Sequence, residues 1–117
     1  MSLERVFKVL VSLDLSHIDA KVYMILALTG PKKKLSIVND LKINKQQISQ
    51  SLVSLQNRGI IFTDLKNKNR FVALPFEKAL ELLIKTEKDK TQILQETRKT
   101  LLSDWKTSIA EKENVKS

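Results

Sequence analysis

The sequence predicts a mainly α-helical protein with one small β-hairpin and a long final helix. Three features predict this class. Apolar residues recur at helical spacing through most of residues 2–58. Two short segments rich in β-branched and aromatic residues, 60–65 and 70–74, flank a polar turn, which is typical of a hairpin. From Phe76 to Ala110 there is neither Gly nor Pro, so one uninterrupted helix is expected.

Length and charge favour one small domain with an appendage. The chain has 117 residues, of which 42% are hydrophobic. Residues 1–75 contain 12 Lys and Arg against 5 Asp and Glu, so this segment holds +7 of the formal net charge of +8. Such a basic excess favours a polyanionic partner. We predict a domain at 1–75, a long helix at 76–110 and a frayed polar tail at 111–117.

Several classes of function lack the residues they need. The chain has no Cys and a single His, so we expect no disulfide, metal site or cofactor. It shows no nucleophile–base pair and no Gly-rich phosphate loop, so we expect no catalytic residues and no enzyme activity. It also lacks a long apolar run and the apolar segment of a signal peptide, which predicts a soluble, cytoplasmic protein without a membrane partner.

The first two helices are predicted from apolar stripes and end signals. Residues 2–13 are apolar over a broad arc and predict a helix that packs against another element. Ser16 is placed to cap a second helix, with Asp19 reaching back to it in a variant of the capping box. Gly30-Pro31 ends that helix, and Lys32-Lys33-Lys34 is expected in the connecting loop.

Residues 35–59 predict a helix-turn-helix. A short helix at 35–41 is followed by a three-residue turn and then by a helix at 45–58. Asn44 is a suitable N-cap for the second of these helices, and Gly59 is a suitable stop. Ile48, Leu52 and Leu55 lie on one face of it, which we expect to be buried.

The opposite face of the 45–58 helix has amides, hydroxyls and positive charge but no acidic residue. A general solvent-exposed helix face usually mixes both signs of charge, whereas these side chains pair with base edges and phosphates. We interpret the helix as a recognition helix in the DNA major groove; an ordinary amphipathic surface helix is the alternative. The predicted DNA contacts are Lys45, Gln46, Gln47, Ser49, Gln50 and Ser54.

The hairpin that follows directly would be the wing of a winged helix-turn-helix domain. Its tip contains Lys66, Lys68 and Arg70, which suit contact with the sugar–phosphate backbone. Lys33 and Lys34 are further candidates for phosphate contact. The alternative for both groups is a solvated basic segment with no partner.

Several short motifs, in order, resemble TrmB-like winged-helix regulators. The segment Leu13 to Tyr23, Gly30-Pro31, the helix ending at Gly59-Ile60-Ile61 and the segment Arg70 to Pro75 are similar to that family's motifs. The resemblance covers about residues 11–85 and implies a transcription-type DNA-binding module found mainly in archaea. The family's recognition helix often has Tyr where this chain has Ser49. Larger members also have a sugar-binding domain, and no small-molecule effector can be identified here.

The long helix predicts a homodimer. Its second apolar cluster has no core of its own chain to pack against, and an exposed apolar stripe is unfavourable. Polar residues interrupt its heptad seam, so parallel and antiparallel packing both remain open. The competing interpretation is a monomer whose helix bends back over residues 2–13. The predicted interface residues are Leu94, Leu101, Leu102, Trp105 and Ile109.

The winged helix could instead serve as a protein–protein interaction module in a larger complex. That function needs apolar anchor residues on the exposed face of the recognition helix. Only Val53 fits that description, so DNA binding is the preferred prediction.

Overall fold

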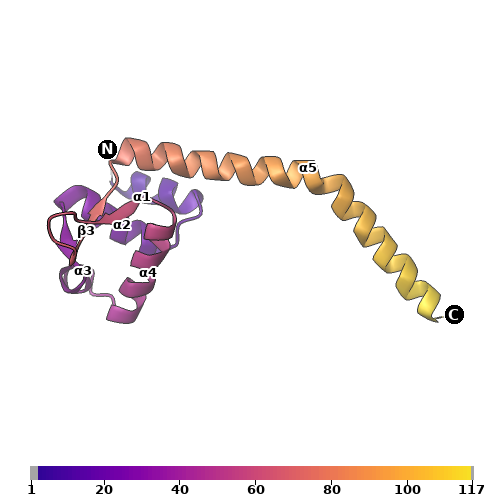
Figure 1. Ribbon diagram of the computed structural model, residues 1–117, viewed down its shortest axis with the longest axis horizontal. Coiled ribbons are helices and arrows are strands. Elements are labelled where there is room, and N and C mark those ends of the chain that lie inside the picture. Colours follow the sequence, from indigo (N-terminus) through magenta and orange to yellow (C-terminus); the bar gives the residue numbers. More distant parts are fainter. Residues whose placement is uncertain (1–2, 117) are drawn as a thin grey trace. The chain divides into compact units, whose positions relative to one another are not determined.

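The computed structural model describes residues 3–116. The first compact unit ends at Leu83 and the second begins at Ile84. The first unit is mainly helical and has a small sheet (Figure 1). The helices are α1 (Leu3–Ser12), α2 (His17–Thr29), α3 (Lys34–Leu41), α4 (Lys45–Asn57) and α5 (Phe76–Lys116), and the strands are β1 (Lys32–Lys33), β2 (Ile61–Thr63) and β3 (Arg70–Ala73).

The core of the first unit forms where α2 and α4 bury their apolar stripes. Tyr23 and Leu26 of α2 are buried with Ile48, Leu52 and Leu55 of α4, at the spacing the sequence predicts. The Tyr23 hydroxyl donates a hydrogen bond to the main-chain carbonyl of Leu74, 51 residues away. Burial raises the pKa of Tyr23 to about 12, so the hydroxyl keeps the proton that this bond requires at neutral pH.

The sheet has three antiparallel strands in the order β1-β3-β2. β2 and β3 are the predicted hairpin, with Thr63 opposite Phe71. β1 is an element that sequence analysis missed, because Lys32-Lys33 was expected in a loop. That expectation was wrong: the pair lies along the other edge of β3, with Lys33 opposite Arg70. A two-residue strand made of lysines shows no apolar alternation, so no periodicity could predict it.

The predicted helix ends are largely present. Asn44 caps α4 by accepting from the Gln47 amide at 2.8 Å. Ser16 caps α2 by accepting from the Asp19 amide at 3.0 Å. Among the described residues the Ser16 amide makes no hydrogen bond to the Asp19 carboxylate, so the other half of the proposed capping box is not formed; that carboxylate accepts from the Ser54 hydroxyl.

The long helix differs from prediction at its end. α5 continues to Lys116, whereas we expected a frayed tail at 111–117. Residues 111–116 contain no helix breaker, so nothing in the sequence stops the helix there. Ser117 lies outside the described residues. None of the described helices, α5 included, combines the length and apolarity needed to cross a membrane.

Substitution of Gly30 tests the backbone conformation of the connection between α2 and β1. Its φ of 90° and ψ of −172° lie in a region that only glycine adopts readily. A Cβ there would meet no atom within 4 Å, so any cost of Gly30→Ala comes from the backbone and not from a clash. We expect the free energy of unfolding in urea to fall by about 1–3 kcal/mol.

The control for this measurement is Lys21→Ala, an exposed helical position where we expect a change within about 0.5 kcal/mol. Equal unfolding free energies for the two variants would contradict the backbone conformation described for Gly30.

Candidate nucleic-acid interface

The first turns of α4 present polar side chains to solvent. Lys45, Gln46, Gln47 and Gln50 are exposed, and Ser49 is partly buried. The helix has no acidic residue to oppose a polyanion. Five of the six residues predicted to contact DNA from this helix therefore lie on an accessible surface that contains no negative charge.

The three glutamines differ in how they are held. The Gln47 side-chain oxygen accepts a hydrogen bond from the side-chain nitrogen (Nδ2) of Asn44 at 3.0 Å, so the capping residue also orients this side chain. The side chains of Gln46 and Gln50 make no hydrogen bond to any described residue, so each side-chain amide can offer both a donor and an acceptor. Bidentate pairing with a base edge needs both groups, which favours Gln46 and Gln50 as base readers.

Ser54, the sixth residue predicted on α4, lies in a different environment. Its hydroxyl donates to Asp19 of α2 at 2.9 Å, in a partly buried setting. Asp19 is only 8% exposed, so this bond satisfies a buried carboxylate. The geometry assigns Ser54 to the packing of α4 on α2.

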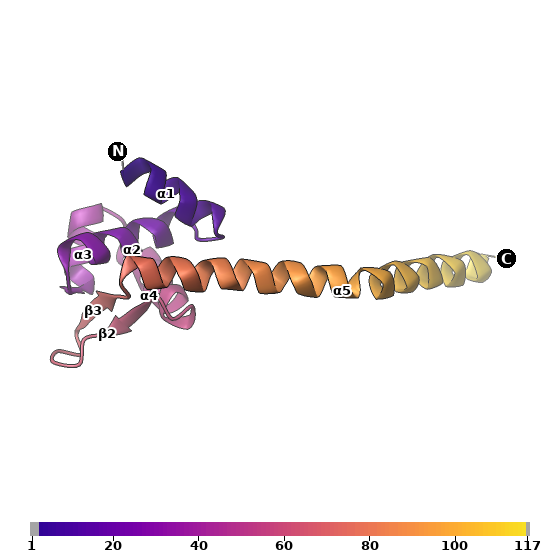
Figure 2. The same cartoon turned by 90° about the horizontal axis from the view of Figure 1, so that it is seen from above.

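The wing loop is organised by Asp64. Its carboxylate accepts from the Lys66 amide at 3.0 Å and from the Arg70 guanidinium. The backbone bond from Lys66, followed by the bond and charge of Arg70, lowers the pKa of Asp64 below its ordinary value. Arg70 is therefore engaged inside the wing, whereas Lys66 and Lys68 are exposed. Figure 2 shows the loop between β2 and β3 to which these two lysines belong.

Four of the predicted DNA-contacting lysines surround one open cavity of about 420 Å³, which we call the lysine pocket. They come from separate parts of the chain: Lys33 from β1, Lys34 from α3, Lys45 from α4 and Lys68 from the wing. The remaining lining residues are Leu35, Ser36, Asn69 and Phe71. The structure thus brings the start of the recognition helix, the wing and the β1–α3 junction to one site.

The carboxylates of the helix-turn-helix and wing are used elsewhere. No acidic residue lines the lysine pocket, and none of its four lysines forms an ion pair with a described residue. Four positive charges without an ion-pair partner therefore lie around the pocket. Four ion pairs of the first unit lie elsewhere: Glu4–Lys8, Asp14–Arg58, Asp40–Lys32 and Asp64–Arg70.

A smaller polar cavity of about 160 Å³ lies on the other flank of α4. Gln47 and Gln50 line it together with Ser16 and Asp19 of the α2 start. Ser51 also lines it, and its buried hydroxyl finds no hydrogen-bond partner among the described residues. Sequence analysis missed this cavity, because it assigned only Ile48, Leu52 and Leu55 to the buried face of α4, and Ser51 is buried beside them.

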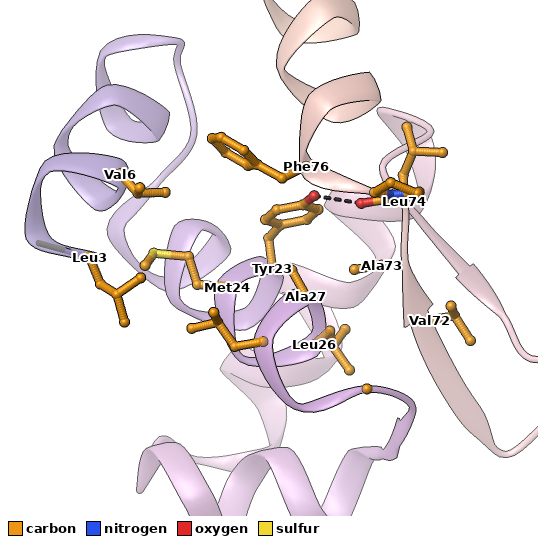
Figure 3. Close-up of a pocket in the computed structure, with 13 residues that line it drawn as sticks. Leu3, Val6, Tyr23, Met24, Leu26, Ala27, Val72, Ala73, Leu74 and Phe76 are labelled. Atoms are coloured by element: carbon orange, nitrogen blue, oxygen red, sulfur yellow. Dashed lines mark hydrogen bonds between the residues drawn. The ribbon is translucent and has the colours of Figure 1, made fainter. Parts of the chain in front are cut away.

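A third cavity, of about 470 Å³, is apolar (Figure 3). Leu3 and Val6 of α1, Met24 of α2 and Phe76 of α5 are among its lining residues, and none of the lining residues is charged. The bond between Tyr23 and the Leu74 carbonyl lies at its wall. Such a surface offers nothing to a polyanion, so it is distinct from the lysine pocket.

The predicted dimer residues are all exposed in the single chain. They belong to the second unit, and Leu94 and Trp105 are 63% and 66% exposed. Exposed side chains of this size leave room for a partner and are costly without one. The interface itself stays a prediction, involving Leu94, Leu101, Leu102, Trp105 and Ile109.

Comparison with known proteins identifies the family. Residues 10–77, more than half of the chain, match the family described as "Sugar-specific transcriptional regulator TrmB". The chain belongs to the TrmB family. The matched segment runs from the end of α1 through the wing, so it contains the whole helix-turn-helix and the lysine pocket. Membership makes this a chain from a family of DNA-binding transcriptional regulators.

One solved structure agrees with the TrmB-family assignment in fold. The chain resembles TrmBL2, described as an archaeal chromatin protein with a novel mode of DNA binding, at a TM-score of 0.74 and 18% identity. The match covers 88% of this chain but only 40% of TrmBL2. A MarR-like regulator from Thermotoga maritima and the transcriptional regulator PA4135 also match, each at a TM-score of 0.48.

For that regulator from Thermotoga maritima the identity is 20%, with 88% of this chain and 96% of the other covered. For PA4135 the identity is 19%, with 92% and 84% covered. No curated protein matches the chain. The first match establishes a winged-helix fold for this TrmB-family chain.

Ser54→Ala separates a packing role from a DNA contact. Removing the hydroxyl leaves an Asp19 carboxylate oxygen buried without its partner, so we expect the unfolding free energy to fall by about 1–3 kcal/mol. We expect the preference among DNA sequences to stay unchanged in a binding-site selection. An unchanged stability together with an altered preference would place Ser54 on the DNA instead.

Proposed function

We propose that the chain is a sequence-specific double-stranded DNA-binding regulator that acts as a homodimer, with α4 in the major groove and the wing on the backbone. One observation supports this most strongly: the exposed, acid-free start of α4 is continuous, through Lys45, with a pocket of unpaired lysines that includes the wing. Base-reading amides and phosphate-binding cations thus occupy one surface, the combination that specific DNA binding requires.

Gln46, Gln47 and Gln50 are the proposed base readers. They lie in the N-terminal turns of α4, the part of a recognition helix that meets base edges. A glutamine amide pairs in bidentate fashion with adenine, so we expect adenine in the preferred sequence. Lys45 and Ser49 would contact phosphates or bases beside them.

Substitution of these glutamines tests the proposal. We expect Gln46→Ala, Gln47→Ala and Gln50→Ala each to weaken binding to the selected sequence by about 1–3 kcal/mol, while binding to unrelated duplexes changes little. Gln47→Ala should have the smallest effect, because Asn44 already holds its side-chain oxygen. The measurement is selection from a random duplex pool, followed by fluorescence anisotropy.

Gln56→Ala, at the far end of the same helix, is the matched control and should leave sequence preference intact. Three variants that prefer the same sequence as wild type would disprove the assignment of α4. A wild-type protein that binds no duplex even at low salt would favour the protein-interaction module, with Val53, 56% exposed, as its anchor on α4.

The homodimer is proposed from the apolar stripe on α5. Leu101 and Trp105 are four residues apart and lie on one helical face, and both are more than half exposed. Burial of apolar surface contributes roughly 25 cal/mol per Å², so an interface of several such side chains is worth several kcal/mol. A second copy is the simplest partner, and two-fold symmetry would present two recognition helices to an inverted repeat.

A double substitution tests the dimer. We expect Leu101→Glu with Trp105→Glu to sediment as a monomer at tens of micromolar, where wild type sediments as a dimer. We also expect it to bind a palindromic site at least tenfold more weakly than wild type, because the two half-sites are no longer bound together. A chain ending at Lys90 should behave in the same way.

Lys106→Gln is the control, since it removes a charge next to Trp105 and leaves every apolar residue of the stripe in place. Wild-type protein that sediments as a monomer at the same concentration would disprove the dimer and the palindromic target together.

A further inference from the structure

The lysine pocket gathers like charges that the protein itself does not neutralise. Lys33, Lys34, Lys45 and Lys68 line one cavity without a carboxylate among the lining residues. Neighbouring Lys32 and Arg70 each pair with an aspartate, so these two cations are neutralised locally. Four unpaired lysines around one cavity raise the local positive potential, which favours binding of an anion there.

A second, independent feature of the pocket also suits an anion. The N-cap of α3 is Lys33, and it makes no side-chain capping bond, in contrast to Ser16 of α2 and Asn44 of α4. The first N–H groups of α3 therefore lack the acceptor that a capped helix has. The first residues of this uncapped helix, Lys34 to Ser36, line the same cavity as the lysines. Uncapped N–H groups beside cations form a favourable phosphate site.

We propose that the lysine pocket binds one phosphate group of the DNA backbone, and that this single phosphate joins the wing to the start of the recognition helix. The inference rests on the proposed DNA-binding function and specifies how the backbone is held. Phosphate fits because its oxygens can accept from several ammonium and N–H donors at once. A DNA phosphate, in preference to free phosphate, fits because Lys45 of the pocket directly precedes the exposed Gln46 and Gln47.

One phosphate shared by several lysines makes a numerical prediction. The slope of log K against log salt falls by about 0.9 for each duplex phosphate that the protein no longer neutralises. If the pocket holds a single phosphate, the triple variant Lys33→Gln, Lys34→Gln, Lys68→Gln loses at most about 0.9 of slope in total, because Lys45 remains beside that phosphate. If the three lysines contacted separate phosphates, the same variant would lose about 2.7.

The experiment measures affinity for a mixed-sequence duplex by fluorescence anisotropy between 50 and 300 mM salt. We expect each single variant to weaken binding several-fold, and the triple variant to weaken it by less than the product of the three effects. Such non-additivity shows that the lysines act on one ligand group. Additive losses with the larger change in slope would overturn the single-phosphate proposal.

The wing provides a matched control. Lys66 and Lys68 are both exposed lysines of the same loop, but only Lys68 lines the pocket. We expect Lys66→Gln to combine additively with Lys34→Gln, whereas Lys68→Gln does not. Equal coupling of both wing lysines to Lys34 would contradict the pocket as the common site.

Folding is checked without DNA. Removing like charges should leave the triple variant at least as stable as wild type to heat at low salt. If it unfolds instead, Lys68→Gln and its combination with Lys34→Gln keep the test available, since residue 68 lies outside every helix and strand.

Inorganic phosphate distinguishes the two sources of the ligand. We expect DNA to compete with it, so that phosphate shifts the amide signals of residues 34–36 in the NMR spectrum of free protein but not of the DNA complex. If phosphate shifts these amide signals equally in the DNA complex, the pocket binds free phosphate and the proposal is overturned.

Wild-type affinity and salt slope for the triple variant would also overturn the proposal while leaving the DNA-binding function in place. Absence of any duplex binding by wild type would instead reject that function.

Discussion

Pairing of β3 along both of its edges is the constraint on which the proposed DNA-binding surface depends. On one edge β3 pairs with β2 to form the wing, and on the other it pairs with β1, which leads directly into α3. Just beyond the strand, the Leu74 amide donates to the Ile60 carbonyl at 2.8 Å, and the Leu74 carbonyl accepts from Tyr23. One short strand thereby fixes the wing relative to α2, and places the β1–α3 junction beside the wing.

Most of the fold could be predicted from sequence because its signals are local. The helical stripes, the caps at Ser16 and Asn44 and the hairpin each occupy a few neighbouring residues, and the structure has them where expected. The exceptions have no local signal. β1 forms by pairing with the edge of β3 that β2 leaves open, and α5 extends beyond Ala110 because polar composition alone does not end a helix.

The site could be predicted less completely, since the partner of a polar side chain is set by tertiary structure. The sequence identified the exposed amides of α4 and the basic wing. It could not show that Ser54 faces Asp19, 35 positions earlier, or that Arg70 is held by Asp64. Nor could it show that Lys33 and Lys68 share one cavity, because that proximity follows from the unpredicted β1.

The strand β1 also has a consequence for how sequences of this kind can diverge. Lys32 is partly buried against Asp40, whereas its neighbour Lys33 is exposed at the pocket. Successive residues of a strand point to opposite faces, so one inserted or deleted residue between Gly30 and Lys34 would exchange these two roles. Chains that preserve the pocket should therefore keep the length of this connection constant, even where the identities of its residues drift. A gap there in an alignment of relatives would mark lineages that have lost the lysine pocket.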